Sequence, residues 1–81
     1  MSYWLIEMMG ASYLSARHLG GYEFYWTEDV HRAIRFINKE QADLMMMAVR
    51  QLRPDLFPIC LPTPIQTTEH VWIPGEGVRR V

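Results

Sequence analysis

The chain has a single cysteine, Cys60, among its 81 residues. One thiol cannot form an intrachain disulfide, whereas small secreted domains usually contain several. It also cannot supply the paired cysteines of common zinc sites, and His18, His31 and His70 follow no recognised metal-ligand spacing. We therefore expect a reducing, cytoplasmic environment and a protein that holds neither a metal nor another cofactor.

Long apolar runs and an excess of charge of one sign are also missing. No segment approaches the roughly 18 apolar residues that a membrane-spanning helix needs. Glu7 interrupts the opening segment, which has no basic residue before it, so we expect no signal peptide. The formal net charge of -1 provides no overall field that would hold a nucleic acid or an acidic membrane. We expect a soluble protein without a membrane role, in which nucleic-acid binding would need a local basic patch.

Catalytic motifs are not recognisable either. Gly20 and Gly21 are not followed by the further glycines, or by the Lys-Ser/Thr pair, that phosphate-binding loops require. Cys60 lies in an apolar run, which favours packing over a nucleophilic role. Adjacent residues such as Glu69 and His70 point to opposite faces of a strand, so their adjacency is no sign of an acid/base pair. We expect a protein that is not an enzyme, with no catalytic residues.

Apolar residues are plentiful, at 49% of the chain, which is enough for one core. Residues 3–8 and 12–17 are rich in strand-forming types on either side of Gly10 and predict a β-hairpin. Alternating aromatic residues predict a third strand over 22–26. Residues 67–73 predict a final strand that could pair with the hairpin.

Two helices are expected between the third and final strands. Thr27 followed by two acids resembles a helix N-cap, and apolar residues at helical spacing up to Ile37 predict a short first helix. Asn38 and Gln41 match a capping box, and Pro54 marks a stop, so a second helix is predicted over 39–52. Its predicted buried stripe consists of Ala42, Met45, Met46, Val49 and Leu52.

The predicted fold class is α+β, with a small antiparallel sheet of three to four strands and two helices packed on one face. Residues 1–73 would form this single domain. Residues 74–81 offer little to bury and are predicted to be a flexible tail. On the first strand, the face of Trp4, Ile6 and Met8 is the preferred core face because it carries no charge.

The aromatic segment 22–26 is the richest candidate for binding, because it is accompanied by arginines and the chain has seven arginines against one lysine. Exposed aromatic rings with guanidinium groups can anchor a protein or stack nucleic-acid bases. Phe24 and Trp26 are expected to pack in the core. The predicted partner-binding residues are Arg17, Tyr22, Tyr25, Arg32 and Arg35.

Three short motifs run through the chain: Tyr-Trp-Leu-Ile-Glu at 3–7, Trp-Thr-Glu-Asp at 26–29 and Glu-His-Val-Trp at 69–72. This outline resembles small uncharacterised accessory proteins found in bacteriophage and prophage genomes. The resemblance implies a protein that binds a host or phage protein inside the host cell, with inhibition of a defence component, as anti-CRISPR proteins do, as its most concrete form. The alternative is a small nucleic-acid-binding module that uses the aromatic and arginine surface. A homodimer would also be compatible with the uncovered sheet edges.

Overall fold

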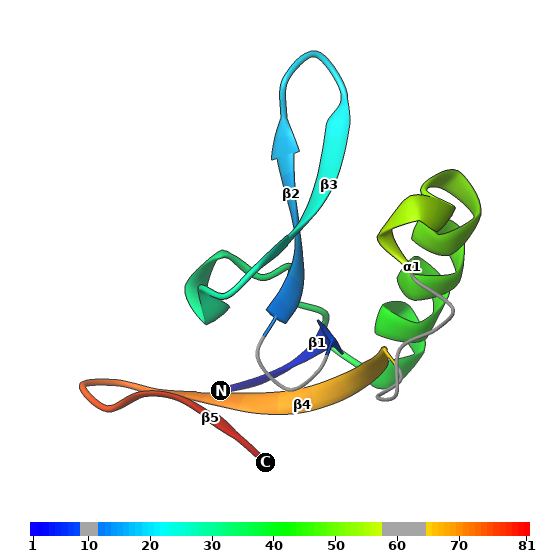
Figure 1. The fold of residues 1–81 in the computed structure, drawn as a ribbon. Coiled ribbons are helices and arrows are strands. Elements are labelled where there is room, and N and C mark those ends of the chain that lie inside the picture. The colour runs from blue at the N-terminus through cyan, green and yellow to red at the C-terminus, as the bar shows by residue number, and fades with distance from the viewer. Residues whose placement is uncertain (9–11, 58–64) are drawn as a thin grey trace.

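The structure, a computed structural model, describes residues 1–8, 12–57 and 65–81. Five strands form one antiparallel sheet in the order β3-β2-β1-β4-β5. The α+β class is confirmed, with five strands where three to four were expected and one α-helix where two were expected (Figure 1). The strands are β1 (Ser2–Met8), β2 (Ser12–His18), β3 (Tyr22–Thr27), β4 (Gln66–Ile73) and β5 (Gly77–Arg80).

The opening hairpin, the third strand and the pairing of the late strand with the first are confirmed. β1 pairs with β2 on one side and with β4 on the other, so that Tyr3 lies opposite His70 and Leu5 opposite Thr68. Residues 9–11, predicted as the first turn, and the proline-rich stretch with Cys60 lie outside the described residues.

The sheet is forked between β1 and β2. Their described residues share two register pairs, Glu7 with Tyr13 and Met8 with Ser12. Beyond these pairs, the β2–β3 hairpin rises away from the layer of β1, β4 and β5 (Figure 1). Such a divergence would leave backbone hydrogen-bonding groups of both strands without partners.

Residues 33–36 fill this fork with an extended segment. Trp4 donates to the Phe36 carbonyl at 2.8 Å, and Phe36 donates back to the Trp4 carbonyl at 2.9 Å. On the other arm of the fork, Ile34 donates to the Leu14 carbonyl at 3.0 Å. The segment therefore replaces the missing strand pairing and joins the two halves of the sheet.

Helix α1 spans Lys39–Leu52, as predicted. The side-chain oxygen of Asn38 accepts a hydrogen bond from the Gln41 backbone at 2.9 Å, which confirms the cap. Ala42 and Val49 are buried against the sheet. Leu52 was predicted for the same stripe but is 71% exposed, because ten positions after Ala42 a helical residue is turned about 80° around the axis.

The predicted first helix is wrong. Only the short 3-10 turn η1 (Val30–Arg32) forms there, and Asp29, not Thr27, caps it by accepting from the His31 backbone at 3.0 Å. The helical spacing of apolar residues is overridden by the backbone partners that the fork offers from residue 33 onward. A second 3-10 turn, η2 (Pro54–Leu56), follows α1.

Part of the predicted flexible tail forms the fifth strand. β5 pairs with β4, with Val78 opposite Trp72 and Arg80 opposite His70. Its few apolar side chains gave no strand signal, because its pairing depends on the backbone ladder with β4 more than on burial.

The preferred Trp4 face of β1 contributes Ile6 and Trp4 to the main core, as predicted, but the opposite face is buried as well. Leu5, Ile6 and Glu7 are successive residues, and each is at most 3% exposed. The α1 side holds the main core, in which Phe24 and Trp26 pack as predicted. Its members are Ile6, Leu14, Phe36, Ala42, Val49 and Phe57, with half-buried Trp4, Phe24, Trp26, Ile34, Met45, Met46, Leu56 and Ile65 around them.

The helices of the described chain include none with the length and apolar character to cross a bilayer.

Two leucine-to-alanine substitutions test which leucines belong to the buried core. Leu14 is fully buried, whereas Leu52 is 71% exposed. We expect Leu14→Ala to lower the free energy of unfolding by about 2–5 kcal/mol through the lost burial and the cavity it leaves. Leu52→Ala should change it by less than about 0.5 kcal/mol. Urea denaturation followed by circular dichroism measures both, and equal losses would contradict the assignment.

Candidate functional site

The five predicted partner-binding residues lie on two different sides of the sheet. Residues paired across antiparallel strands share a face, and successive residues alternate. Tyr22 therefore lies on the α1 side with Phe24, whereas Arg17 and Tyr25 lie on the opposite side with Ser15. The Ser15 hydroxyl donates to the Arg32 carbonyl, which places η1 on that opposite side as well.

Arg17, Tyr25 and Arg32 are already engaged with neighbours on the opposite side. The Arg17 guanidinium carbon lies 4.5 Å from the centre of the Tyr25 ring, a cation–π arrangement. The Arg32 side chain is paired with Asp29 at 3.4 Å in an exposed ion pair. Because the Arg32 side chain is 71% exposed, its guanidinium group stays accessible to a partner.

On the α1 side, an apolar cleft lies between the β2–β3 hairpin and the helix. Its hollow of about 460 Å³ is lined by Ala16, Tyr22, Phe24, Ile34 and Met45. Tyr22, at 75% exposed, stands at its edge. The cleft exists because the hairpin diverges from β1 and leaves α1 to cover only part of the hairpin's inner face (Figure 1).

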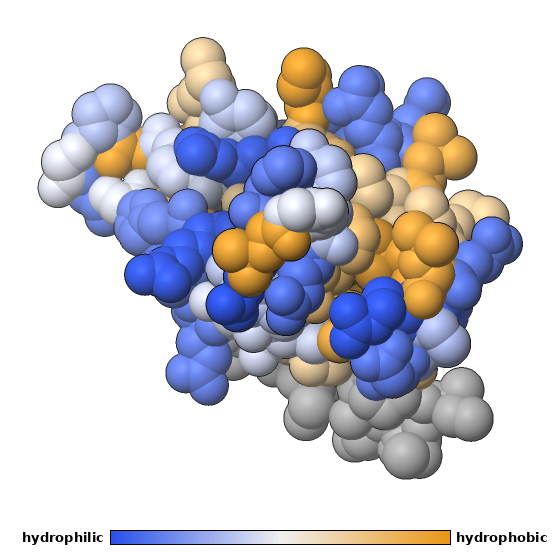
Figure 2. All heavy atoms as spheres, turned by 90° about the horizontal axis from the view of Figure 1, so that it is seen from above, coloured by the Kyte–Doolittle hydropathy of each residue, from blue (hydrophilic) through white to orange (hydrophobic). Residues whose placement is uncertain are grey.

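A second apolar hollow continues from the first along α1. It measures about 410 Å³ and is lined by Phe36, Gln41, Leu44, Met45 and Ala48. Met45 is common to both hollows, so together they form one surface, called here the α1 groove. Seen from above the hairpin, hydrophobic side chains gather toward the helix side among hydrophilic ones (Figure 2).

The exposed apolar residues of α1 extend this groove. Leu44 and Leu52 are 67% and 71% exposed and, with Ala48, recur at steps of four on one side of the helix. Met47 is also exposed, at 59%, but it lines neither hollow. Water-facing apolar residues at this density mark interaction surfaces more often than isolated ones do.

Arg35 belongs to an aromatic group on the side opposite α1. Its guanidinium carbon lies 5.3 Å from the Trp72 ring centre and 5.6 Å from that of Tyr3, and the two rings meet edge to face at 5.4 Å. The sequence pointed to Arg35 but not to Trp72 or Tyr3. The missing signal was strand register, since Tyr3 and Trp72 approach only when β1 pairs with β4.

A buried polar cluster lies on the same side. The Thr68 hydroxyl donates to a Glu7 carboxylate oxygen at 2.8 Å, and His70 Nε2 lies 3.6 Å from that oxygen. These three residues are at most 5% exposed. The sequence could not link Glu7 to the face of the last strand that carries Thr68 and His70, because Glu7 and Thr68 are 61 positions apart.

The Tyr13 ring closes this cluster, edge to face with His70 at 5.7 Å between ring centres. Burial and the nearby Glu7 carboxylate raise the pKa of the Tyr13 hydroxyl above its ordinary value of 10.0, and Arg80 opposes the shift. An acid, an imidazole and two hydroxyls thus lie together, with Glu7, Thr68 and His70 buried and Tyr13 half-buried. Their contacts join β1, β2 and β4.

The described part of the chain contains no group of three or more metal-ligating side chains. Comparison of the chain with protein-family models, curated proteins and solved structures found no match.

Two variants of the buried cluster compare the loss of a buried ring with the loss of one acceptor atom. His70→Ala should lower the free energy of unfolding by about 3 kcal/mol, because it leaves a cavity and removes a polar neighbour of the buried Glu7 side chain. Glu7→Gln keeps an acceptor for Thr68 and should cost about 1 kcal/mol. Chemical denaturation at neutral pH measures both changes, and a larger loss for Glu7→Gln would contradict the arrangement.

The titration of Tyr13 gives a second test of the same cluster. Since Glu7 raises the pKa of Tyr13, Glu7→Gln should lower that pKa toward its ordinary value. The folded pKa is the higher one, so Tyr13 contributes stability that is complete below pH 10 and is lost as the pH rises through the folded pKa. Ultraviolet absorbance of tyrosinate, with Tyr13→Phe to identify the signal, measures the shift. An unchanged pKa in Glu7→Gln would place the carboxylate away from Tyr13.

Proposed function

We propose that the protein is a non-enzymatic phage or prophage accessory protein that acts by binding a host or phage protein. The α1 groove is the observation that carries the protein-binding part. It presents a continuous apolar surface on both sides of Met45, with Leu44 and Tyr22 exposed at its borders. The outline at residues 3–7, 26–29 and 69–72 supports the phage context.

The groove also defines the chemistry of its partner. Its lining is apolar apart from the Gln41 amide and the Tyr22 hydroxyl. A complementary surface would therefore be an apolar segment of a folded protein, with a few polar groups and no cluster of charge. Inhibition of a host or bacterial defence component is the most concrete form of this proposal, since an inhibitor needs a stable scaffold and one complementary surface.

Nucleic-acid binding is the second candidate, and the opposite side of the sheet favours it. Two pairs, Arg17 with Tyr25 and Arg35 with Trp72, each place a guanidinium group over an aromatic ring. Proteins that bind single-stranded nucleic acids use arginines and aromatic rings in this way. The two candidates differ in salt dependence. Binding to phosphates weakens steeply as salt rises, whereas burial of apolar surface does not.

Affinity capture from a nuclease-treated bacterial lysate, followed by mass spectrometry, can identify the protein partner. The purified partner is then titrated by calorimetry at two salt concentrations. We expect Leu44→Asp to weaken binding at least about tenfold, because it places a charge against an apolar partner surface. We expect Met47→Asp, the same kind of change on the same helix but outside both hollows, to have little effect.

Three outcomes would contradict the protein-binding proposal. Equal losses in the two aspartate variants would show that the groove is not the contact. Recovery of nucleic acid alone, without nuclease, would favour the second candidate. A dimer in size-exclusion chromatography with light scattering that Leu44→Asp dissociates would assign the groove to a second copy of this chain.

A further inference from the structure

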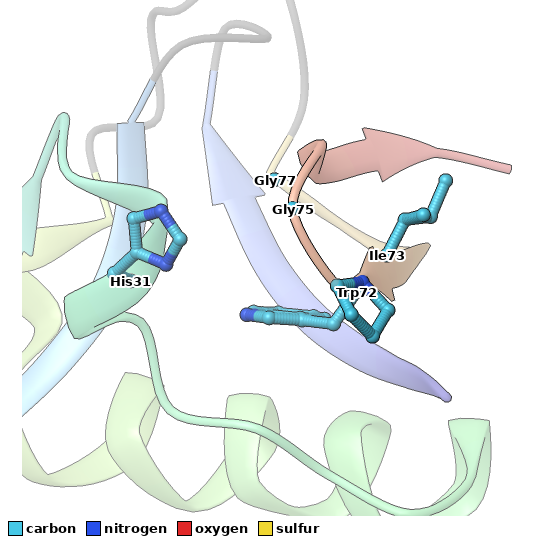
Figure 3. A pocket seen from close by; sticks show the side chains of 6 residues that line it. His31, Trp72, Ile73, Gly75 and Gly77 are labelled. Carbon is cyan, nitrogen blue, oxygen red and sulfur yellow. The ribbon is translucent and has the colours of Figure 1, made fainter.

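A third hollow lies on the side of the sheet opposite the α1 groove. It measures about 390 Å³ and is lined by His31 of η1, by Trp72 and Ile73 of β4, and by Pro74, Gly75 and Gly77. In Figure 3 the Trp72 indole extends across the opening toward His31, with its ring nitrogen leading. Two flat rings from segments 41 positions apart thus face one open space.

One side of the hollow carries no side chains. Gly75 and Gly77 have φ angles of 80° and 93°, in the region that favours glycine. A Cβ at either position would meet nothing within 4 Å. This side of the hollow is therefore formed by backbone and leaves room beside the Trp72 ring.

A positively charged side chain, Arg35, lies beside the hollow. Arg35 stacks on Trp72 at 5.3 Å, and no described carboxylate forms an ion pair with it. Two acids in the segments that border the hollow are already paired, Asp29 with Arg32 at 3.4 Å and Glu76 with Arg79 at 3.9 Å. A guanidinium held in place by aromatic rings can form paired hydrogen bonds to a phosphate.

We propose that this hollow binds a nucleobase together with its phosphate. The base would stack on Trp72 opposite His31, with its edge toward the glycine turn, and Arg35 would receive the phosphate. A volume of about 390 Å³ admits one such ring system. The ligand could be a free mononucleotide or one unit of a single-stranded nucleic acid, since both present the same chemistry.

This proposal does not depend on the proposed protein-binding groove, because the two sites share no lining residue. The Leu44→Asp variant should therefore bind nucleotides as the unaltered protein does. Failure of one proposal leaves the other unaffected.

The test is an NMR titration of the isotope-labelled full chain with adenosine monophosphate, with adenosine, and with a single-stranded oligothymidylate of about eight nucleotides. The three tryptophans give three indole N–H resonances, and Trp72→Phe identifies that of Trp72. We expect adenosine monophosphate to shift this resonance saturably and to bind about tenfold more tightly than adenosine.

Two variants and one matched control assign the contacts. Arg35→Gln should remove the preference for the monophosphate over adenosine. Trp72→Ala should weaken the binding of both ligands about tenfold, because the base loses its stacking partner. Arg50→Gln also removes an arginine from an aromatic ring, that of Phe57, but away from the hollow, so it should leave mononucleotide binding unchanged. Unshifted Trp4 and Trp26 resonances would show that each variant is folded.

The two probes distinguish the two sources of the ligand. Saturation by adenosine monophosphate assigns the site to a free nucleotide, whereas saturation by the oligothymidylate alone assigns it to a strand, and both support the proposal. The absence of a Trp72 shift with every probe would overturn it. A shift that Arg35→Gln and Trp72→Ala leave unchanged would overturn it as well.

Discussion

The backbone hydrogen bonds between Trp4 and Phe36 hold the chain in the fork where β1 and β2 separate. Without them, two strands of the sheet would expose unpaired backbone groups in the middle of the molecule. With them, the chain passes from η1 on one side of the sheet to α1 on the other (Figure 1). The same segment delivers Phe36 to the main core and Arg35 to the opposite side.

Both candidate surfaces depend on the path that residues 33–36 take through the fork. The hairpin diverges, so α1 covers it incompletely, and the apolar α1 groove remains open around Met45. On the other side, η1 brings His31 to face Trp72, and Arg35 stacks on the Trp72 ring. One small sheet thus presents an apolar groove on one side and, on the other, an aromatic hollow beside Arg35.

Local signals in the sequence predicted the elements that depend on local interactions. The Asn38 cap and Pro54 defined α1, and alternation defined four of the five strands. The sequence could not predict the extended segment 33–36, because its partners Trp4 and Leu14 are distant in the chain, nor β5, whose pairing relies on backbone. For the same reason it grouped Arg35 and Tyr22 in one predicted surface, although they lie on opposite sides of the sheet, and it could not link Glu7 to His70.

Amide hydrogen exchange of Ile34, Trp4 and Phe36 tests the role of the fork most directly. If residues 33–36 complete the sheet, these three amides should exchange as slowly as those of the central β1–β4 ladder, because they open only when the sheet does. Exchange at the rate of exposed turns would contradict this account, since the two halves of the sheet would then lack the connection on which both surfaces depend.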